Sequence, residues 1–235
     1  MLFLLTGDVQ IGKTRWLENL CASLQAAGTC VAGVVAPGQW VPRPEGQPGG
    51  KHGFDGAGRF EKLGIDNVLL PQGTRIEFAR RRDLAADSKA FAEGTQAKAA
   101  KLGWAISDTA IAQVNAHFAT LAKQAGITPA DNGADAHAAA PTSTETQLAP
   151  HAMLVVDELG RLELLRGCGL TNALAILDAG PTPQFPHAIA VVRETLLDEA
   201  SRRFEPRWGE PIAISPDDAS RELVLETVNV TGNAR

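Results

Sequence analysis

The chain has 235 residues, of which 44% are apolar and 21% are charged, and these values predict one globular domain with a buried core. They exclude a collagen, a coiled coil and a chain that is disordered throughout. Lys and Arg together number 22 and Asp and Glu 27, so the net charge is −5. The chain therefore lacks the excess of basic residues that is typical of a nucleic-acid-binding surface. An aromatic content of 5% without any tyrosine also disfavours stacking on single-stranded bases.

Cysteine and hydropathy patterns indicate the compartment. The three cysteines, Cys21, Cys30 and Cys168, show no C-x-x-C spacing, which favours free thiols in a reducing cytosol over disulfides or a zinc site. The apolar run at the N-terminus is too short for a signal peptide, and no segment has the uncharged length of a membrane span. We therefore expect a cytoplasmic protein that does not bind a membrane.

Short apolar runs alternate with helical patterns along the chain. The runs expected to form the core of a sheet are residues 2–6, 30–36, 153–157, 188–192 and 211–214. Helices are expected over residues 14–27, 108–125, 170–179, 195–204 and 217–228. Weaker patterns suggest strands at 67–72, 74–82 and 104–106, and a helix within 84–102. This alternation predicts an α/β fold, namely a doubly wound, mostly parallel sheet with helices on both faces.

Two segments between these elements differ in composition. Pro and Gly dominate residues 37–60, which we expect to form an irregular hairpin or surface loop. Residues 126–150 contain almost no large apolar side chain, so they cannot bury enough surface to fold and are expected to be a flexible insertion. Both segments are assigned to the single domain that spans residues 1–235.

The strongest motif follows the first predicted strand. Residues 7–14, GDVQIGKT, match the phosphate-binding pattern G-x-x-x-x-G-K-[ST] between a buried strand and a helix. In such a loop the backbone N–H groups point at a phosphate chain, the lysine contacts the β- and γ-phosphates, and the Ser or Thr hydroxyl binds Mg²⁺. The nucleotide-binding residues predicted here are Gly7, Asp8, Val9, Gln10, Ile11, Gly12, Lys13, Thr14 and Arg15. The Asp8 carboxylate is expected to point away from the phosphates.

A second motif ends the apolar run at residues 153–156. An apolar strand followed by Asp157 is typical of the Walker B segment, whose carboxylate holds Mg²⁺. Glu158, expected on the loop leaving the strand, is suited to polarise a water molecule that attacks the γ-phosphate. The alternative is an Asp-Glu pair that only ends a strand.

Other residues have weaker signals. Arg193 follows the predicted strand 188–192, at the strand end where ligands bind in a doubly wound sheet, and is a candidate for stabilising the γ-phosphate. It could instead be a solvated arginine paired with Glu194 or Asp198. Residues 80–82 are a run of three arginines, more typical of a solvated strand end. Trp40 and Trp104 could stack on a nucleobase, but tryptophans more often anchor packing.

These motifs, in this order, resemble the cancer-related nucleoside triphosphatases, a family of small P-loop NTPases. The similar segments are residues 3–14, 33–35 with 51–55, 103–108, 155–164 and, loosely, 188–215. The most distinctive is 157–164, DELGRLEL, which is similar to the family signature Asp-Glu-Ile-Gly-basic-Met-Glu-Leu. The resemblance implies a P-loop NTPase fold and Mg²⁺-dependent hydrolysis of nucleoside triphosphates to diphosphate and phosphate. It applies to Gly7, Gly12, Lys13, Thr14, Asp157 and Glu158.

The sequence thus favours a Mg²⁺-dependent nucleoside triphosphatase that binds ATP or GTP. Lys13, Glu158 and Arg193 are its predicted catalytic residues, and Thr14 and Asp157 its predicted metal ligands. Two alternatives stay open. One is a nucleotide or nucleoside kinase, which requires a second substrate, and the other is a GTP- or ATP-binding accessory protein in cofactor biosynthesis, in which binding matters more than turnover.

Overall fold

The computed structural model describes residues 1–43, 59–85, 91, 104–127 and 151–232. Within these residues, nine strands form one sheet in the order β6-β5-β4-β2-β7-β8-β1-β9, and β3 pairs with β4 outside that path. The strands are β1 (Leu2–Leu5), β2 (Val31–Val35), β3 (Gly38–Pro42), β4 (Phe60–Leu70), β5 (Thr74–Arg81), β6 (Trp104–Ile106), β7 (Met153–Leu159), β8 (His187–Val192) and β9 (Ile212–Ile214). The helices are α1 (Lys13–Ala26), α2 (Arg82–Ala85), α5 (Asp108–Gln124), α6 (Arg161–Arg166), α7 (Thr171–Ala179), α8 (Leu197–Trp208) and α9 (Asp218–Gly232), and a 3₁₀ turn, Glu194–Leu196, precedes α8.

The five strands predicted from apolar runs form one parallel block. The strands β2, β7, β8, β1 and β9 are neighbours in that order, and each adjacent pair is parallel. The strand β1 therefore lies between two strands from the C-terminal third of the chain. This arrangement confirms the predicted α/β fold with a doubly wound, mostly parallel sheet.

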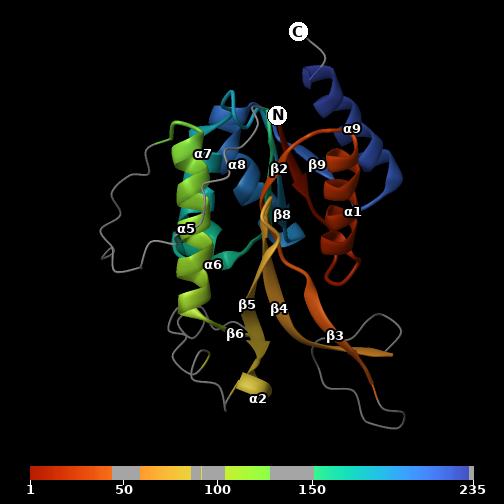
Figure 1. Ribbon diagram of the computed structural model, residues 1–235, viewed down its shortest axis with the longest axis vertical. Coiled ribbons are helices and arrows are strands. Elements are labelled where there is room, and N and C mark those ends of the chain that lie inside the picture. Colours follow the sequence, from red (N-terminus) through yellow and green to blue (C-terminus); the bar gives the residue numbers. More distant parts are fainter. Residues whose placement is uncertain (44–58, 86–90, 92–103, 128–150, 233–235) are drawn as a thin grey trace.

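Helices cover both faces of the parallel block, as Figure 1 shows with the sheet seen nearly edge-on. Side chains on a strand alternate between faces, so Phe3 and Leu5 of β1 pack in the core beside α1 and α9. Leu2 and Leu4 pack in the other core, with the apolar faces of α5, α7 and α8. Ser107 is the N-cap of α5, because its Oγ accepts a hydrogen bond from the Ala110 N–H at 3.2 Å.

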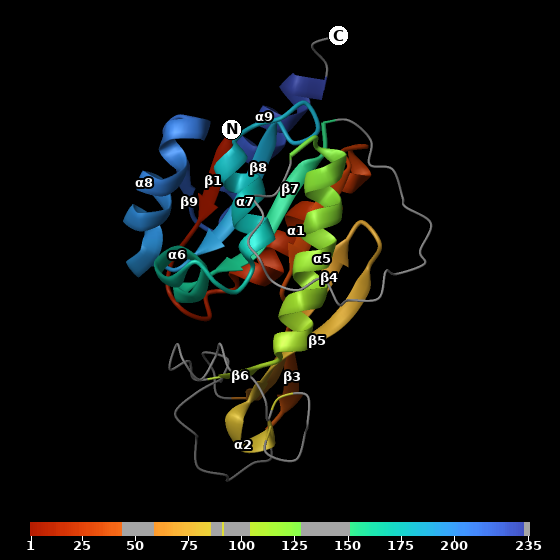
Figure 2. The same ribbon diagram turned by 90° about the vertical axis from the view of Figure 1, so that its left-hand side faces the viewer.

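The remaining strands form an antiparallel extension of the sheet, made of β3, β4, β5 and β6. It joins the parallel block where β4 pairs with β2 in antiparallel register, Gly33 opposite Leu70. The extension projects beyond the helices that cover the block, toward α2 (Figure 2). The predicted hairpin at 37–60 begins and ends in regular pairing of β3 with β4, and residues 44–58 lie outside the described residues. Most of the predicted insertion, residues 128–150, and most of the predicted helix within 84–102 also lie outside them.

Several elements differ from the sequence prediction, among them β4, which begins at Phe60 and not at the expected residue 67. The strand β7 continues through Leu159, so Glu158 lies within the strand and not on the loop after it, because pairing with β8 resumes after a register shift at Leu159 opposite Val192. The short helix α6 was not predicted. The helix α8 ends at Trp208, beyond the expected end at Phe204.

Among the helices of the described residues, none is long and apolar enough to cross a membrane.

Candidate nucleotide-binding site

The predicted phosphate loop connects β1 to α1 at the carboxyl end of the parallel strands. Gly7 and Gly12 have φ values of 128° and 94°, which L-residues with a side chain rarely adopt, so glycine at both positions permits the loop conformation. Gly12 is the N-cap of α1, and the first backbone N–H groups of the helix follow it directly. Asp8 is exposed, as expected, and so are Val9, Ile11 and Arg15. The loop thus presents a helix N-terminus suited to bind an anion.

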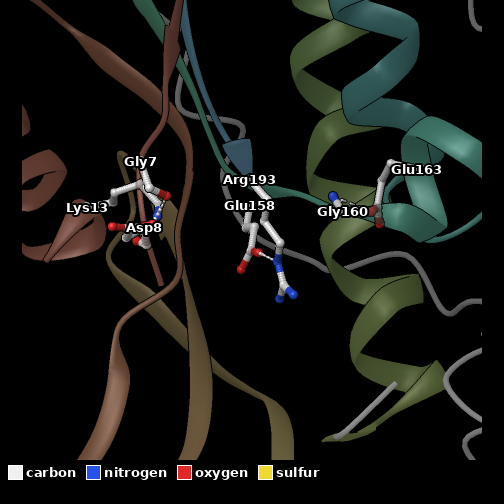
Figure 3. A network of polar contacts seen from close by, with 7 residues as sticks. All are labelled: Gly7, Asp8, Lys13, Glu158, Gly160, Glu163 and Arg193. Carbon is white, nitrogen blue, oxygen red and sulfur yellow. Dashed lines mark hydrogen bonds and ion pairs between the residues drawn. The ribbon is translucent and has the colours of Figure 1, made fainter. Parts of the chain in front are cut away.

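Lys13 lies across this loop. Its Nζ donates hydrogen bonds of 2.7 Å to the backbone oxygens of Gly7 and of Asp8 (Figure 3). Burial lowers the pKa of the ammonium, whereas the carboxylates of Glu158, Asp157 and Asp8 raise it and the Arg193 charge lowers it. Lys13 therefore shares one electrostatic environment with both predicted acidic residues.

Asp157 and Thr14 are brought together as predicted. The Asp157 side chain is buried, with 3% exposed, and its Oδ2 accepts a hydrogen bond of 3.0 Å from the Ala36 N–H. Burial, with a smaller effect of Glu158, raises the pKa of this carboxyl to about 6, although hydrogen bonds from Ala36 and the Thr14 side chain lower it.

The donor set at Thr14 and Asp157 fits Mg²⁺. A hydroxyl and a carboxylate are hard oxygen ligands of the kind that Mg²⁺ prefers, and Mg²⁺ sites commonly use one or two protein ligands together with substrate phosphates. Within the described part of the chain, no group of three or more His, Cys, Asp or Glu residues could hold a metal ion.

Glu158 and Arg193 form an ion pair at the ends of neighbouring strands. The Arg193 Nε donates to Glu158 Oε1 at 2.8 Å, and the two side chains are 56% and 38% exposed (Figure 3). Arg193 thus pairs with Glu158 and not with Glu194 or Asp198, the two partners that its position in the sequence suggested. The structure therefore places the two predicted catalytic side chains, from β7 and from the residue after β8, in direct contact.

Glu163 of α6 holds the turn between β7 and α6. The Glu163 side chain is buried and accepts hydrogen bonds from the Gly160 N–H at 2.9 Å and the Leu170 N–H at 3.0 Å. The first of these caps α6. Burial raises the pKa of Glu163, and the two backbone donors lower it. This cap explains why a helix of six residues forms where the sequence pattern gave no helical signal.

Lys62 of β4 also lies beside these residues, although its sequence pattern did not predict a site residue. The side chain is mostly buried, which lowers its pKa, and the charges of Glu158 and Asp157 raise it. A signal was present, because residues 64–66 repeat the Gly-apolar-Asp pattern that the family resemblance placed at residues 53–55. Residues 53–55 lie outside the described residues, whereas Asp66 is buried and bonded to Gln39 and Arg75.

The other sequence candidates are accounted for by local contacts. Arg80 pairs with Glu77, and Arg81 pairs with Glu61 and Asp83, so both arginines have carboxylate partners at the end of β5. The Lys62 ammonium lies over the rings of both Trp40 and Trp104, so the ring faces that it covers are not free for a nucleobase.

Comparisons with known proteins support the fold. No family model matches the sequence, and no curated protein matches it. Among solved structures, THEP1 from the hyperthermophile Aquifex aeolicus is similar at a TM-score of 0.53 and 12% identity, over 97% of this chain and 96% of that one. A human cancer-related nucleoside triphosphatase is similar at a TM-score of 0.49 and 18% identity, over 100% of this chain and 98% of that one.

The chain shares the fold of THEP1. This agrees with the α/β fold, a mostly parallel sheet with helices on both faces, that the sequence predicted.

Proposed function

We propose that this chain is a Mg²⁺-dependent nucleoside triphosphatase that hydrolyses a triphosphate such as ATP or GTP to diphosphate and phosphate. The observation that carries the proposal is the convergence of five predicted residues at one edge of the sheet. Lys13 on the phosphate loop, the Thr14–Asp157 contact and the Glu158–Arg193 pair share one electrostatic environment. The fold shared with THEP1 is consistent with this use of the site.

Phosphate binding is assigned to the loop. The backbone N–H groups after Gly7 and the N-terminus of α1 would bind the phosphate oxygens. The Lys13 ammonium, which donates to the Gly7 and Asp8 carbonyls without ligand, would exchange these acceptors for the β- and γ-phosphates. Thr14 and Asp157 would hold Mg²⁺, which when bound draws charge from the phosphate oxygens.

The hydrolytic step is assigned to Glu158. Its carboxylate orients a water molecule and accepts a proton from it while the water oxygen bonds to the γ-phosphorus. The bond between that phosphorus and the bridging oxygen breaks, and its electron pair leaves with the diphosphate. Arg193, released from Glu158, would then stabilise charge on the γ-phosphate oxygens.

The substitution Glu158→Gln tests this proposal. It keeps the size of the side chain but removes the charge that accepts the proton, so kcat should fall at least about a hundredfold. The affinity for Mg²⁺–triphosphate should stay close to that of the wild type, because Glu158 is assigned to the water and not to the phosphates. Phosphate release from ATP, GTP, CTP, UTP and dNTPs, with and without Mg²⁺, measures turnover, and calorimetry measures affinity.

Glu226→Gln on the exposed face of α9 is the matched control and should leave turnover unchanged. Turnover at the wild-type rate in Glu158→Gln would reject the role of Glu158. Slow wild-type turnover that the substitution does not alter would favour a binding-only accessory protein. An effect seen only with an added phosphate acceptor would favour a kinase.

A further inference from the structure

A lysine from the antiparallel extension is held beside the site by two tryptophans. Lys62 of β4 lies opposite Trp40 of β3 in the strand register, and its Nζ is 5.8 Å from the centroid of that ring. The same Nζ is 5.7 Å from the ring centroid of Trp104 on β6. Both distances fit a cation–π contact, which attracts an ammonium most strongly when water is excluded. Two rings from separate strands thus restrict where the ammonium can lie.

The backbone around this lysine leaves space for its stem. A Cβ at Gly38, at the start of β3, would lie 2.6 Å from Lys62 Cε and 2.6 Å from Trp40 Nε1. Only a residue without a side chain therefore leaves both groups where they are. Gly38, Trp40 and Trp104 thus lie around the end of the Lys62 side chain.

The Lys62 ammonium has N–H donors that no described protein oxygen accepts. Among the residues that the structure describes, it contacts the two rings but has no hydrogen-bond acceptor and no ion pair. Lys13 and Arg193, by contrast, each donate to an oxygen. An ammonium has three N–H donors, and the faces of two rings supply none of the oxygen acceptors that a phosphate would offer.

The position of Lys62 indicates which part of a ligand it would meet. A Cβ at Gly38 would lie 2.6 Å from Lys62 Cε, and Gly38 is two residues after Ala36, whose N–H donates to Asp157 Oδ2 at 3.0 Å. The Lys62 side chain therefore reaches toward the strand end that carries Asp157 and Glu158, where the proposed function puts the terminal phosphate and the attacking water. The charges of Glu158 and Asp157, which raise the pKa of the ammonium, agree with this position.

We propose that Lys62 is a further catalytic residue, whose ammonium binds a terminal phosphate oxygen of the nucleoside triphosphate and stabilises the charge that develops there during hydrolysis. Trp40 and Trp104 act as positioning residues that aim this ammonium. The inference rests on the proposed function, and it adds a cation supplied by the chain's own antiparallel extension to those of the loop and of β8.

The test compares Lys62→Met with the wild type and with Lys123→Met, which removes an exposed lysine from the last turn of α5. Phosphate release from Mg²⁺–ATP and Mg²⁺–GTP gives kcat, and calorimetry gives the affinities for the triphosphate and the diphosphate. Loss of one aimed donor should lower kcat of Lys62→Met by about 10²–10³-fold. Its triphosphate affinity should fall while its diphosphate affinity stays at the wild-type value. Lys62→Arg should recover part of the loss, and Lys123→Met should match the wild type.

A merely structural role for Lys62 would weaken diphosphate and triphosphate binding equally, and that result would overturn the inference. Wild-type kcat in a folded Lys62→Met would overturn it too. Trp40→Leu should lower kcat less than Lys62→Met and leave diphosphate binding unchanged. If Lys62→Met does not fold, as judged by circular dichroism, Lys62→Gln is measured by the same criteria.

The proposed function and this inference fail in different ways. Hydrolysis that is lost in Glu158→Gln but retained in Lys62→Met would reject the role of Lys62 alone. A wild type that hydrolyses no triphosphate would reject the proposed function. In that case a selective loss of triphosphate over diphosphate binding in Lys62→Met would still support contact with the terminal phosphate, and equal affinities would overturn it.

Discussion

The parallel block and the antiparallel extension of this sheet are stabilised by different interactions. Every residue of β1, β2 and β8 is buried, and in β7 only Glu158 is not. In β3 and β5, most positions are partly or fully exposed, and polar contacts join the strands, among them Asp66 with Gln39 and Arg75. The block therefore has the character of a hydrophobic core, whereas the extension is a ribbon with polar links.

This difference matters because the candidate site draws on both regions. The phosphate loop, Asp157, Glu158 and Arg193 come from the parallel block, and Lys62 with its two tryptophans comes from the extension. Changes in the block should affect stability and activity together unless they lie at strand ends. Changes in the extension should affect activity with little effect on global stability.

The largest effect on stability is expected from Phe118→Ala in α5. Phe118 is fully buried in the core that α5 forms with the block, so a large cavity should lower the free energy of unfolding by about 3–5 kcal/mol. Phe60→Ala at the start of β4 is the matched change in the extension, where the side chain is 40% exposed, and should cost less than about 1 kcal/mol. Urea unfolding measures both, and equal costs would contradict the contrast between the two regions.

The next largest effect is expected on activity, from Lys13→Ala. Removal of an ammonium that neutralises phosphate charge should lower kcat by about 10²–10³-fold and weaken triphosphate binding. Because Lys13 is at the first position of α1 and is not part of the buried core, the free energy of unfolding should change little. Calorimetry and urea unfolding of the same variant check the two statements. Unchanged nucleotide affinity in folded Lys13→Ala would reject the phosphate-loop assignment.

A smaller effect should appear when the pH falls. Burial, with the charges of the Met1 amino group and of His151, lowers the pKa of His187 at the start of β8 from 6.5 to about 4. The unfolded chain therefore takes up a proton that the folded block does not, so stability should be full above pH 6.5 and fall between pH 6.5 and 4. The loss from this group is at most about 3 kcal/mol. Urea unfolding across this pH range should show a shallower decline in His187→Gln, and an identical decline would exclude His187 as the cause.

The smallest effect is expected from the loss of ion pairs that are still partly accessible to water. Arg81→Gln removes contacts to Glu61 and Asp83 in the extension, and Arg203→Gln removes the contact to Asp178 between α8 and α7. Each should change the free energy of unfolding by less than about 1 kcal/mol. Amide hydrogen exchange should nevertheless rise in β4 and β5 for Arg81→Gln, because polar contacts carry more of the local stability there. Faster exchange confined to the parallel block would contradict this.

The parallel block was predictable because its signals are local. Apolar runs marked all five strands, and the GDVQIGKT and Asp157-Glu158 motifs marked the strand ends where the site lies. Thr14 and Asp157, and likewise Glu158 and Arg193, meet because parallel strands present their carboxyl ends at one edge.

The extension was less predictable because its features depend on distant contacts. Lys62 stands in a strand of mixed polarity, and its relation to Glu158 follows only from the antiparallel pairing of β4 with β2. The helix α6, which follows β7 and lies outside the extension, was missed for the same reason. It depends on one buried carboxylate, Glu163, and not on a repeating pattern. Such contacts leave no periodic trace in the sequence.

The position of β1 in the sheet has a consequence for how the chain folds during its synthesis. The neighbours of β1 are β8 and β9, so its first pairing partner, His187–Val192, emerges about 180 residues later. At a synthesis rate of about 5–20 residues per second, that delay is roughly 10–40 s. Pairing across such a separation also raises the contact order, which slows folding. The phosphate loop that follows β1 is thus the first part of the site to be translated and among the last to be fixed, and a nascent chain cannot bind nucleotide at a completed site until its final strands are in place.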